Sequence, residues 1–154
     1  MKKLLLSFAL LVSCLVTNAQ EYTVQSAGQG QGGRYLVAVQ VSVKKLKTSA
    51  EDIAMHYATH GVLFRGLPAA EGYGEQKPLV KEPNAEQTKA EFFNAFFGEA
   101  KYRDFCSVVP GSVSSMKNKK TKKIETTATV SIDKEALQHY LEEAGVVKGF
   151  SNLW

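Results

Sequence analysis

Alternation of apolar and polar residues predicts the strands of this chain. The segments 35–43 and 124–132 both alternate, and many of their apolar positions hold β-branched residues. A period of two is typical of a strand that has one face in the core and the other in water. The segment 105–116, with Pro110-Gly111 as a bulge or turn, is the expected hairpin partner of 124–132.

Other apolar positions recur with the period of amphipathic helices. Ser49 precedes a predicted helix over 50–65, and Asn84 precedes a second one over 85–97. Asp133 begins a last helix. All three polar residues are of types that accept a hydrogen bond from the first turn of a helix.

The second predicted helix contains half of the eight phenylalanines of the chain. Residues four apart share one face of a helix, so Phe92 is expected over Phe96 and Phe93 over Phe97. Burying one such ring stabilises a protein by about 1.5–3 kcal/mol, which favours core packing for all of them. The alternative is an exposed aromatic groove around Phe92–Phe97 that takes a protein partner.

These elements predict a single α+β domain over residues 34–154. Its mainly antiparallel sheet would have about three to five strands, with about three helices on one face, in the order β-α-α-β-β-α. A final strand over 146–150 stays an open alternative. Residues 20–33 are rich in glycine and glutamine and predict a flexible leader. The order of elements resembles that of small accessory domains of the Gram-negative envelope, but no residue motif accompanies the likeness and it implies no site residues.

The first residues have the pattern of a bacterial export signal. Lys2 and Lys3 precede an apolar run over 4–16, and small residues follow at Thr17 and Ala19. A run of thirteen residues is too short to span a bilayer as a helix. Cleavage after Ala19 would make residues 1–19 a signal peptide and release a soluble protein into the periplasm.

A second processing route stays open. The residues Leu11-Val12-Ser13-Cys14 are similar to a bacterial lipobox, in which Cys14 becomes lipidated after residues 1–13 are removed. Leu15 and Val16 then continue the apolar run where a polar tether is usual. By this route the protein would be held at the outer membrane or cell surface of a Gram-negative bacterium, and its only membrane attachment would be the lipid.

Composition and charge narrow the classes of partner. The chain is 44% apolar and 22% charged, as ordinary globular proteins are. Its net charge of +4 includes Lys2 and Lys3, so the mature protein is near balance and gives no case for nucleic acid. Cys106 lies in a predicted strand, where a buried and inert thiol is expected. No cofactor is expected.

His56 and His60 are the strongest candidates for chemistry. They are four residues apart on the first predicted helix, a spacing that lets two imidazoles share a metal ion. The glutamate of the H-E-x-x-H motif is missing beside the first histidine, which weakens the prediction. Structural histidines are the alternative. No catalytic residue is predicted with them.

Five lysines lie between the two arms of the predicted hairpin: Lys117, Lys119, Lys120, Lys122 and Lys123. At a hairpin tip they are expected to form a solvated turn. The alternative is an anion-binding surface for lipid head groups, phosphates or acidic glycans of the envelope.

The sequence thus predicts an exported envelope protein that binds an envelope protein or an anionic envelope component without catalysis. The loop over 67–84 and the lysine turn are the candidate surfaces. Two alternatives stay open: a metal-dependent or hydrolytic enzyme that uses His56 and His60, and a protein-interaction module with the aromatic groove around Phe92–Phe97. The oligomeric state is not predicted.

Overall fold

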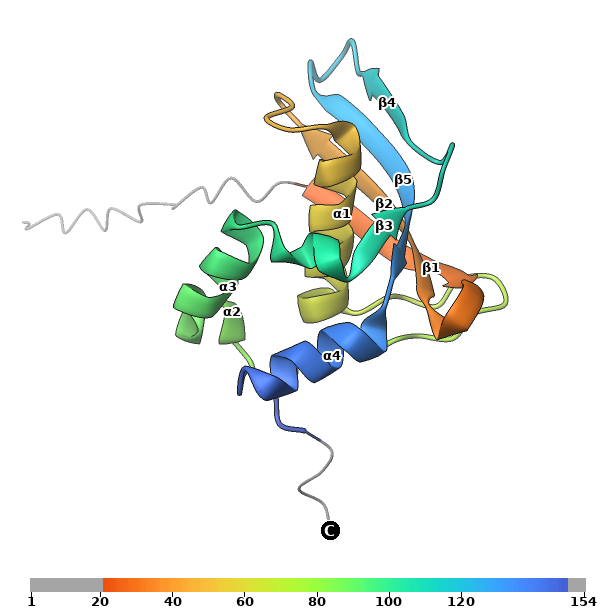
Figure 1. Cartoon of the computed structure of the whole chain (residues 1–154). Helices are drawn as coiled ribbons and strands as arrows, with labels where there is room; N and C mark the ends of the chain where they lie inside the picture. Colours follow the sequence, from red (N-terminus) through yellow and green to blue (C-terminus); the bar gives the residue numbers. More distant parts are fainter. Residues whose placement is uncertain (1–20, 150–154) are drawn as a thin grey trace, which may run out of the picture.

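The computed structural model describes residues 21–149, in which five strands form one antiparallel sheet (Figure 1). The order across the sheet is β1-β2-β5-β3, and β4 pairs with the same edge of β5 as β3 does. β3 and β4 therefore form one arm of the predicted hairpin, interrupted at Pro110-Gly111. The strands are β1 (Glu21–Gln29), β2 (Tyr35–Val43), β3 (Cys106–Val108), β4 (Ser114–Lys117) and β5 (Ile124–Ile132).

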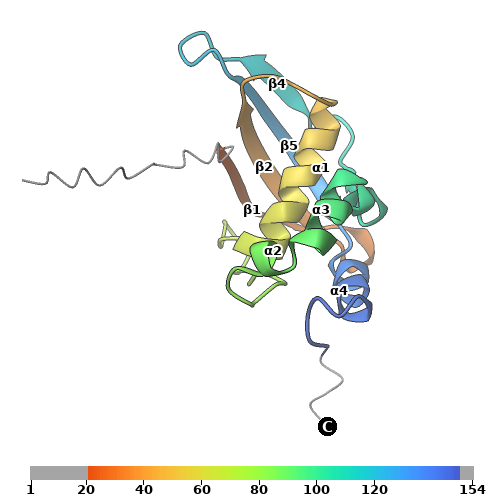
Figure 2. The same cartoon turned by 90° about the vertical axis from the view of Figure 1, so that its left-hand side faces the viewer.

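Helices cover one face of this sheet. Figures 1 and 2 show α1 lying along the sheet, with α4 at the end of the molecule opposite the turn between β4 and β5. The predicted α+β architecture of two layers is confirmed. No helix among residues 21–149 has the length and apolar composition that crossing a membrane requires. The helices are α1 (Ala50–His60), α2 (Ala85–Thr88), α3 (Ala90–Gly98) and α4 (Lys134–Glu143), with shorter turns η1 (Gln31–Gly33), η2 (Gly61–Arg65) and η3 (Lys101–Asp104).

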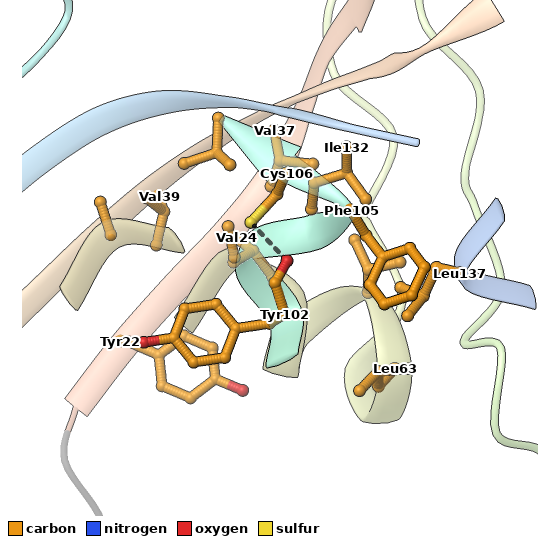
Figure 3. Packing of buried hydrophobic residues seen from close by; sticks show 14 of the residues in the cluster. Tyr22, Val24, Val37, Val39, Leu63, Tyr102, Phe105, Cys106, Ile132 and Leu137 are labelled. Atoms are coloured by element: carbon orange, nitrogen blue, oxygen red, sulfur yellow. Dashed lines mark hydrogen bonds between the residues drawn. The ribbon is translucent and has the colours of Figure 1, made fainter. Parts of the chain in front are cut away.

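The core lies between the sheet and α1, where the alternation of β2 and β5 directs apolar side chains (Figure 3). Val37, Val41 and Val130 are fully buried, as the alternation predicts. The other face of these strands holds mainly Ser, Thr, Gln and Ala residues and faces solvent. One buried face of the sheet is therefore enough to organise the domain.

Helix α1 approaches the sheet closely because its inner face has small residues. Ala54 and Ala58 are fully buried against the sheet. A Cβ atom on Gly61 would lie 2.6 Å from Cγ2 of Val24, so β1 would have to move away to accept any side chain there. The predicted start of the helix is confirmed, since Oγ of Ser49 accepts a hydrogen bond from the backbone N–H of Asp52 at 3.1 Å.

The prediction of a flexible leader over 20–33 is wrong for residues 21–29, which form β1. Tyr22, Val24 and Ser26 alternate into the core, and the strand pairs with β2 along its length. A bulge after Ser26 is completed by Gly28, whose φ of +115° favours glycine. Glycine here serves one defined turn of the backbone and does not indicate flexibility.

The predicted helix over 85–97 is interrupted at Lys89, which separates α2 from α3. The expected cap at Asn84 is also wrong, because this residue has a left-handed backbone with φ of +59° and its side chain makes no capping bond. Nζ of Lys89 instead donates to the carbonyl oxygen of Val146 at 2.6 Å and to Glu82 at 2.8 Å.

Residues 146–149 form no strand, so the final strand left open for 146–150 is not found in its described part. The chain is instead turned back at the end of α4. Gly145 has a φ of +70°, and the N–H of Val146 donates to the carbonyl of Leu141 at 2.9 Å. This is a common way to end a helix, and it places Val146 in the core.

The predicted loop over 67–84 is present and tied to the helical layer. The N–H of Leu79 donates to the carbonyl of Val62 at 3.1 Å, and that of Val80 to the carbonyl of Leu63 at 2.9 Å. Val80 is buried. The part of the loop around Leu79 and Val80 is thus packed as part of the fold.

Candidate functional site

A groove of about 580 Å³ opens between α1, α3 and β1. β1 contributes Tyr22, and α1 contributes both predicted histidines, His56 and His60. α3 contributes Phe93, Asn94 and Phe97. We call this the histidine–aromatic groove. It brings the metal-ligand candidates and the phenylalanine helix of the sequence to one place.

His60 is held at both of its ring nitrogens. Nε2 lies 3.0 Å from Oε1 of Glu86, and Nδ1 lies 2.5 Å from the hydroxyl of Tyr22. An ionised carboxylate can only accept hydrogen bonds, so Nε2 has the proton and, in the neutral ring, Nδ1 accepts from Tyr22. The three side chains form a hydrogen-bonded relay, in which Glu86 fixes the tautomer of His60.

Arg65 holds the other side of Tyr22. Its guanidinium carbon lies 3.7 Å from the centre of the Tyr22 ring, and Nη1 donates to the Tyr22 carbonyl at 2.8 Å. Burial raises the pKa of Tyr22 to about 12, although the positive charge of Arg65 acts in the opposite direction. The hydroxyl therefore keeps its proton at neutral pH and serves as a donor.

His56 is placed differently from His60. Its ring contacts Phe97 at 4.7 Å between centres, and Tyr57 at 4.9 Å. Within residues 21–149 it has no hydrogen-bond partner. Burial, together with the nearby His60, lowers the pKa of His56, so the ring is neutral at pH 7. Its nitrogens are available to a ligand in the groove.

The predicted metal site at His56 and His60 lacks a third ligand in the described part of the chain. No group of three or more His, Cys, Asp or Glu side chains is placed there to hold a metal ion. Glu86 is the carboxylate that contacts His60, but it accepts a hydrogen bond from the N–H at Nε2 and so occupies that nitrogen. The imidazole of His60 is therefore hydrogen-bonded and that of His56 is free, so the two rings do not form an equivalent pair of metal ligands.

The four phenylalanines of α3 divide between core and groove. Phe92 and Phe96 stack with centres 6.1 Å apart, as predicted. Phe93 packs instead edge-on against Phe64 at 4.8 Å, and Phe97 contacts both histidines. Core packing is confirmed for Phe93 and Phe96, which are buried, whereas Phe97 forms part of the groove wall.

The lysine turn lies beyond the opposite end of α1, between β4 and β5 (Figure 1). Four of the five predicted lysines are exposed, and the fifth, Lys123, lies 3.6 Å from a carboxylate oxygen of Glu21. Asn118 organises the turn, since its Oδ1 accepts from the N–H of Lys120 at 2.9 Å and its Nδ2 donates to Glu125 at 2.9 Å. The predicted hairpin tip is therefore an ordered turn.

Sequence reasoning missed a buried carboxylate on α1. Oδ1 of Asp52 accepts from the hydroxyl of Tyr102 at 2.8 Å and from Nε of Arg103 at 2.8 Å. Burial acts to raise the pKa of Asp52, but the bonds from Tyr102 and Arg103 outweigh it and hold the pKa below 3.8. Asp52 is thus ionised, and it ties α1 to η3.

Cys106 is buried in β3, as expected (Figure 3). Its Sγ donates to the carbonyl of Tyr102 at 3.1 Å and accepts from the hydroxyl of Thr59 at 3.6 Å. Burial raises the pKa of the thiol to about 11, which leaves it protonated and unreactive. Cys14, the predicted lipidation site, lies outside the described residues.

Tyr22, Arg65 and Glu86 also belong to the groove and were not predicted. They reach it from β1, η2 and α2, and the bonds that join them connect residues 26 to 43 positions apart in the chain. No local pattern signals such pairs. Only the short alternation around Tyr22 could have indicated that this residue faces the core.

Comparison of the chain with models of protein families, with curated proteins and with solved structures finds no match. The groove and the lysine turn are therefore interpreted from their own geometry.

Proposed function

We propose that this chain is an exported, non-catalytic binding module of the bacterial envelope, and that the histidine–aromatic groove holds its ligand. One observation supports the groove above other surfaces. The two predicted histidines and the phenylalanine helix line a single cavity of about 580 Å³. This is within the range of about 300–1,000 Å³ that small-molecule sites occupy.

The lining favours a neutral ligand with a flat apolar face. Tyr57 and Phe97, which are half-buried, provide aromatic surface in the groove. Its charged side chains are hydrogen-bonded within the fold, Glu86 to His60 and Arg65 to the carbonyl of Tyr22. A ligand that binds either charge directly would have to compete with these bonds.

Polar groups at the edge would fix the orientation of such a ligand. His56 has free ring nitrogens, and the exposed Asn94 adds an amide with both donor and acceptor atoms. A sugar ring has this combination of a flat apolar face and a polar edge. We propose a glycan of the envelope as the ligand class.

The relay of Glu86, His60 and Tyr22 is the observation that favours the hydrolytic alternative. Its order of carboxylate, imidazole and hydroxyl is that of a nucleophile activated by a base. The hydroxyl of Tyr22 is a poor nucleophile near neutral pH, however, because burial raises its pKa to about 12. Binding therefore agrees better with these residues than catalysis does.

Location in the envelope rests on the sequence of the first residues. A basic start, an apolar run over 4–16 and small residues at Thr17 and Ala19 support export. The mass of the mature protein distinguishes a chain that starts at Gln20 from one that starts at a lipidated Cys14. A cytosolic protein that retains residues 1–19 would contradict export.

The glycan is tested with N,N′-diacetylchitobiose, titrated into the protein while amide chemical shifts are followed by NMR. We expect shifts in α1 and α3 around the groove. H56A removes the free imidazole and should weaken binding by about fivefold or more, because a lost hydrogen bond costs roughly 1 kcal/mol.

H139A is the matched control, since His139 is an exposed histidine on α4, away from the groove. It should leave the affinity unchanged. Chitobiose that shifts no groove residue, or that binds H56A as tightly as the natural protein, would contradict the proposed ligand site.

A further inference from the structure

Two separate segments bring lysines to one end of the sheet. β2 ends at Val43, which pairs with Ile124 at the start of β5. The loop that follows β2 therefore lies at the same end as the turn between β4 and β5, as Figures 1 and 2 both show. This end, near the top of both views, is called the lysine end. Its lysines are Lys44, Lys45, Lys47, Lys117, Lys119, Lys120, Lys122 and Lys123.

Positive charge is concentrated at the lysine end, whereas the rest of the described chain has a slight excess of acidic residues. Outside the lysine end, the described residues have nine basic and eleven acidic side chains. The acidic residues at the lysine end are Glu21, Glu51, Asp52 and Glu125. Three of them are engaged, Glu21 by Lys123, Asp52 by Arg103 and Glu125 by Asn118. A nearly balanced chain thus presents one strongly positive surface.

An apolar side chain accompanies the lysines. Met116, on β4, is 71% exposed, the largest value among the large apolar residues described. It pairs across the sheet with Glu125 and directly precedes Lys117. Lysines around an exposed apolar residue suit a surface that has charge outside and hydrocarbon beneath.

The described chain also begins at this end. Glu21 pairs with Ser42, next to the end of β2, and its carboxylate lies 3.6 Å from Nζ of Lys123. The apolar run over 4–16 and Cys14 precede it in the sequence by only a few residues. A lipid on Cys14 would therefore be joined to the domain on the side that has the lysines.

We infer that the lysine end docks on a bilayer surface rich in anionic phospholipid. The lysines contact lipid phosphates, and Met116 enters the head-group region between them. Such contacts would act together with a lipid on Cys14, because the described chain begins at the same end of the domain. The inference concerns a surface remote from the histidine–aromatic groove and does not depend on the proposed ligand there.

Vesicle binding by the full chain, as the producing cell processes it, tests this inference. K119Q/K120Q in the turn and K44Q/K45Q in the loop each remove two exposed charges. On phosphatidylcholine vesicles with about 30% phosphatidylglycerol, each double variant should bind about thirtyfold more weakly, because each lysine near an anionic surface contributes about fivefold to the affinity. Combining the two variants should multiply the losses, since both segments face one plane.

K77Q/K148Q is the matched control, because Lys77 and Lys148 are exposed and lie outside the lysine end. It should bind as the natural protein does. Equal weakening by this control would show that only total charge matters and would overturn the inference. Equal binding to pure phosphatidylcholine would also overturn it. So would a protein that binds soluble heparin while the anionic vesicles capture none of it.

Discussion

The two ends of α1 differ in how far their charged side chains are bonded within the fold. Near its C-terminal end, in the histidine–aromatic groove, Glu86 and Arg65 both have partners within the fold. Near its N-terminal end, only Lys123 of the eight lysines forms an ion pair among the described residues. The groove therefore offers shape and apolar surface to a ligand, whereas the lysine end offers an electrostatic field. Charged groups that are bonded within the fold hold its elements together, whereas lysines without ion pairs are available to a partner.

The largest expected effect comes from removing the ring that supports the groove. Phe96 is 3% exposed and stacks between Phe92 and Phe105. F96A should lower the free energy of unfolding by about 3–5 kcal/mol, because it leaves a cavity that the neighbouring rings cannot fill. Urea denaturation measures the change. A loss below about 1 kcal/mol would show that Phe96 does not support the groove as its buried, stacked position indicates.

A smaller effect is expected at Asp52, the one carboxylate near the lysine end that is buried. D52N keeps the size of the side chain but removes the charge that Arg103 and Tyr102 bind. The free energy of unfolding at pH 7 should fall by about 1.5–3 kcal/mol, the range for hydrogen bonds to a charged group.

The loss at Asp52 should depend on pH. The folded pKa of Asp52 lies below its ordinary value of 3.8, so the carboxylate stabilises the fold fully above that value and loses its contribution as the pH falls through the folded pKa. The difference in stability between the natural protein and D52N should therefore be constant near neutral pH and shrink below about pH 4. A difference that persists undiminished to pH 2 would contradict this explanation.

The smallest effect on stability is expected at the lysine turn. K119Q/K120Q changes two exposed side chains whose charges have no ion-pair partner in the described structure. The free energy of unfolding should change by no more than about 0.5 kcal/mol. A clear loss of stability would mean that these charges serve the fold, and the contrast between the two ends of α1 would then fail.

Much of the fold could be predicted from local patterns. The strict alternation of β2 and β5 fixes which face is buried, and the cap at Ser49 fixes the start of α1. β1 was missed because its polar positions hold Gln and Thr and its end holds glycines, a composition that also suits a flexible segment. What makes it a strand is pairing with β2, a contact that its own residues do not reveal.

The site could be predicted only in part. The spacing of His56 and His60 correctly places both on one side of α1, but their different roles come from distant residues. Glu86 reaches His60 only because the loop 67–84 folds back on η2. The loop after β2 joins the lysine turn only through the register of β2 and β5, which the sequence does not state.

The place of β5 in the sheet has a consequence for how the protein is made. This strand pairs with β2, β3 and β4, yet it is formed by residues 124–132, which follow all three of its partners in the sequence. Before those residues are available, β1 and β2 form only a two-stranded hairpin, which has marginal stability by itself. The native sheet can therefore assemble only after residue 132 is available.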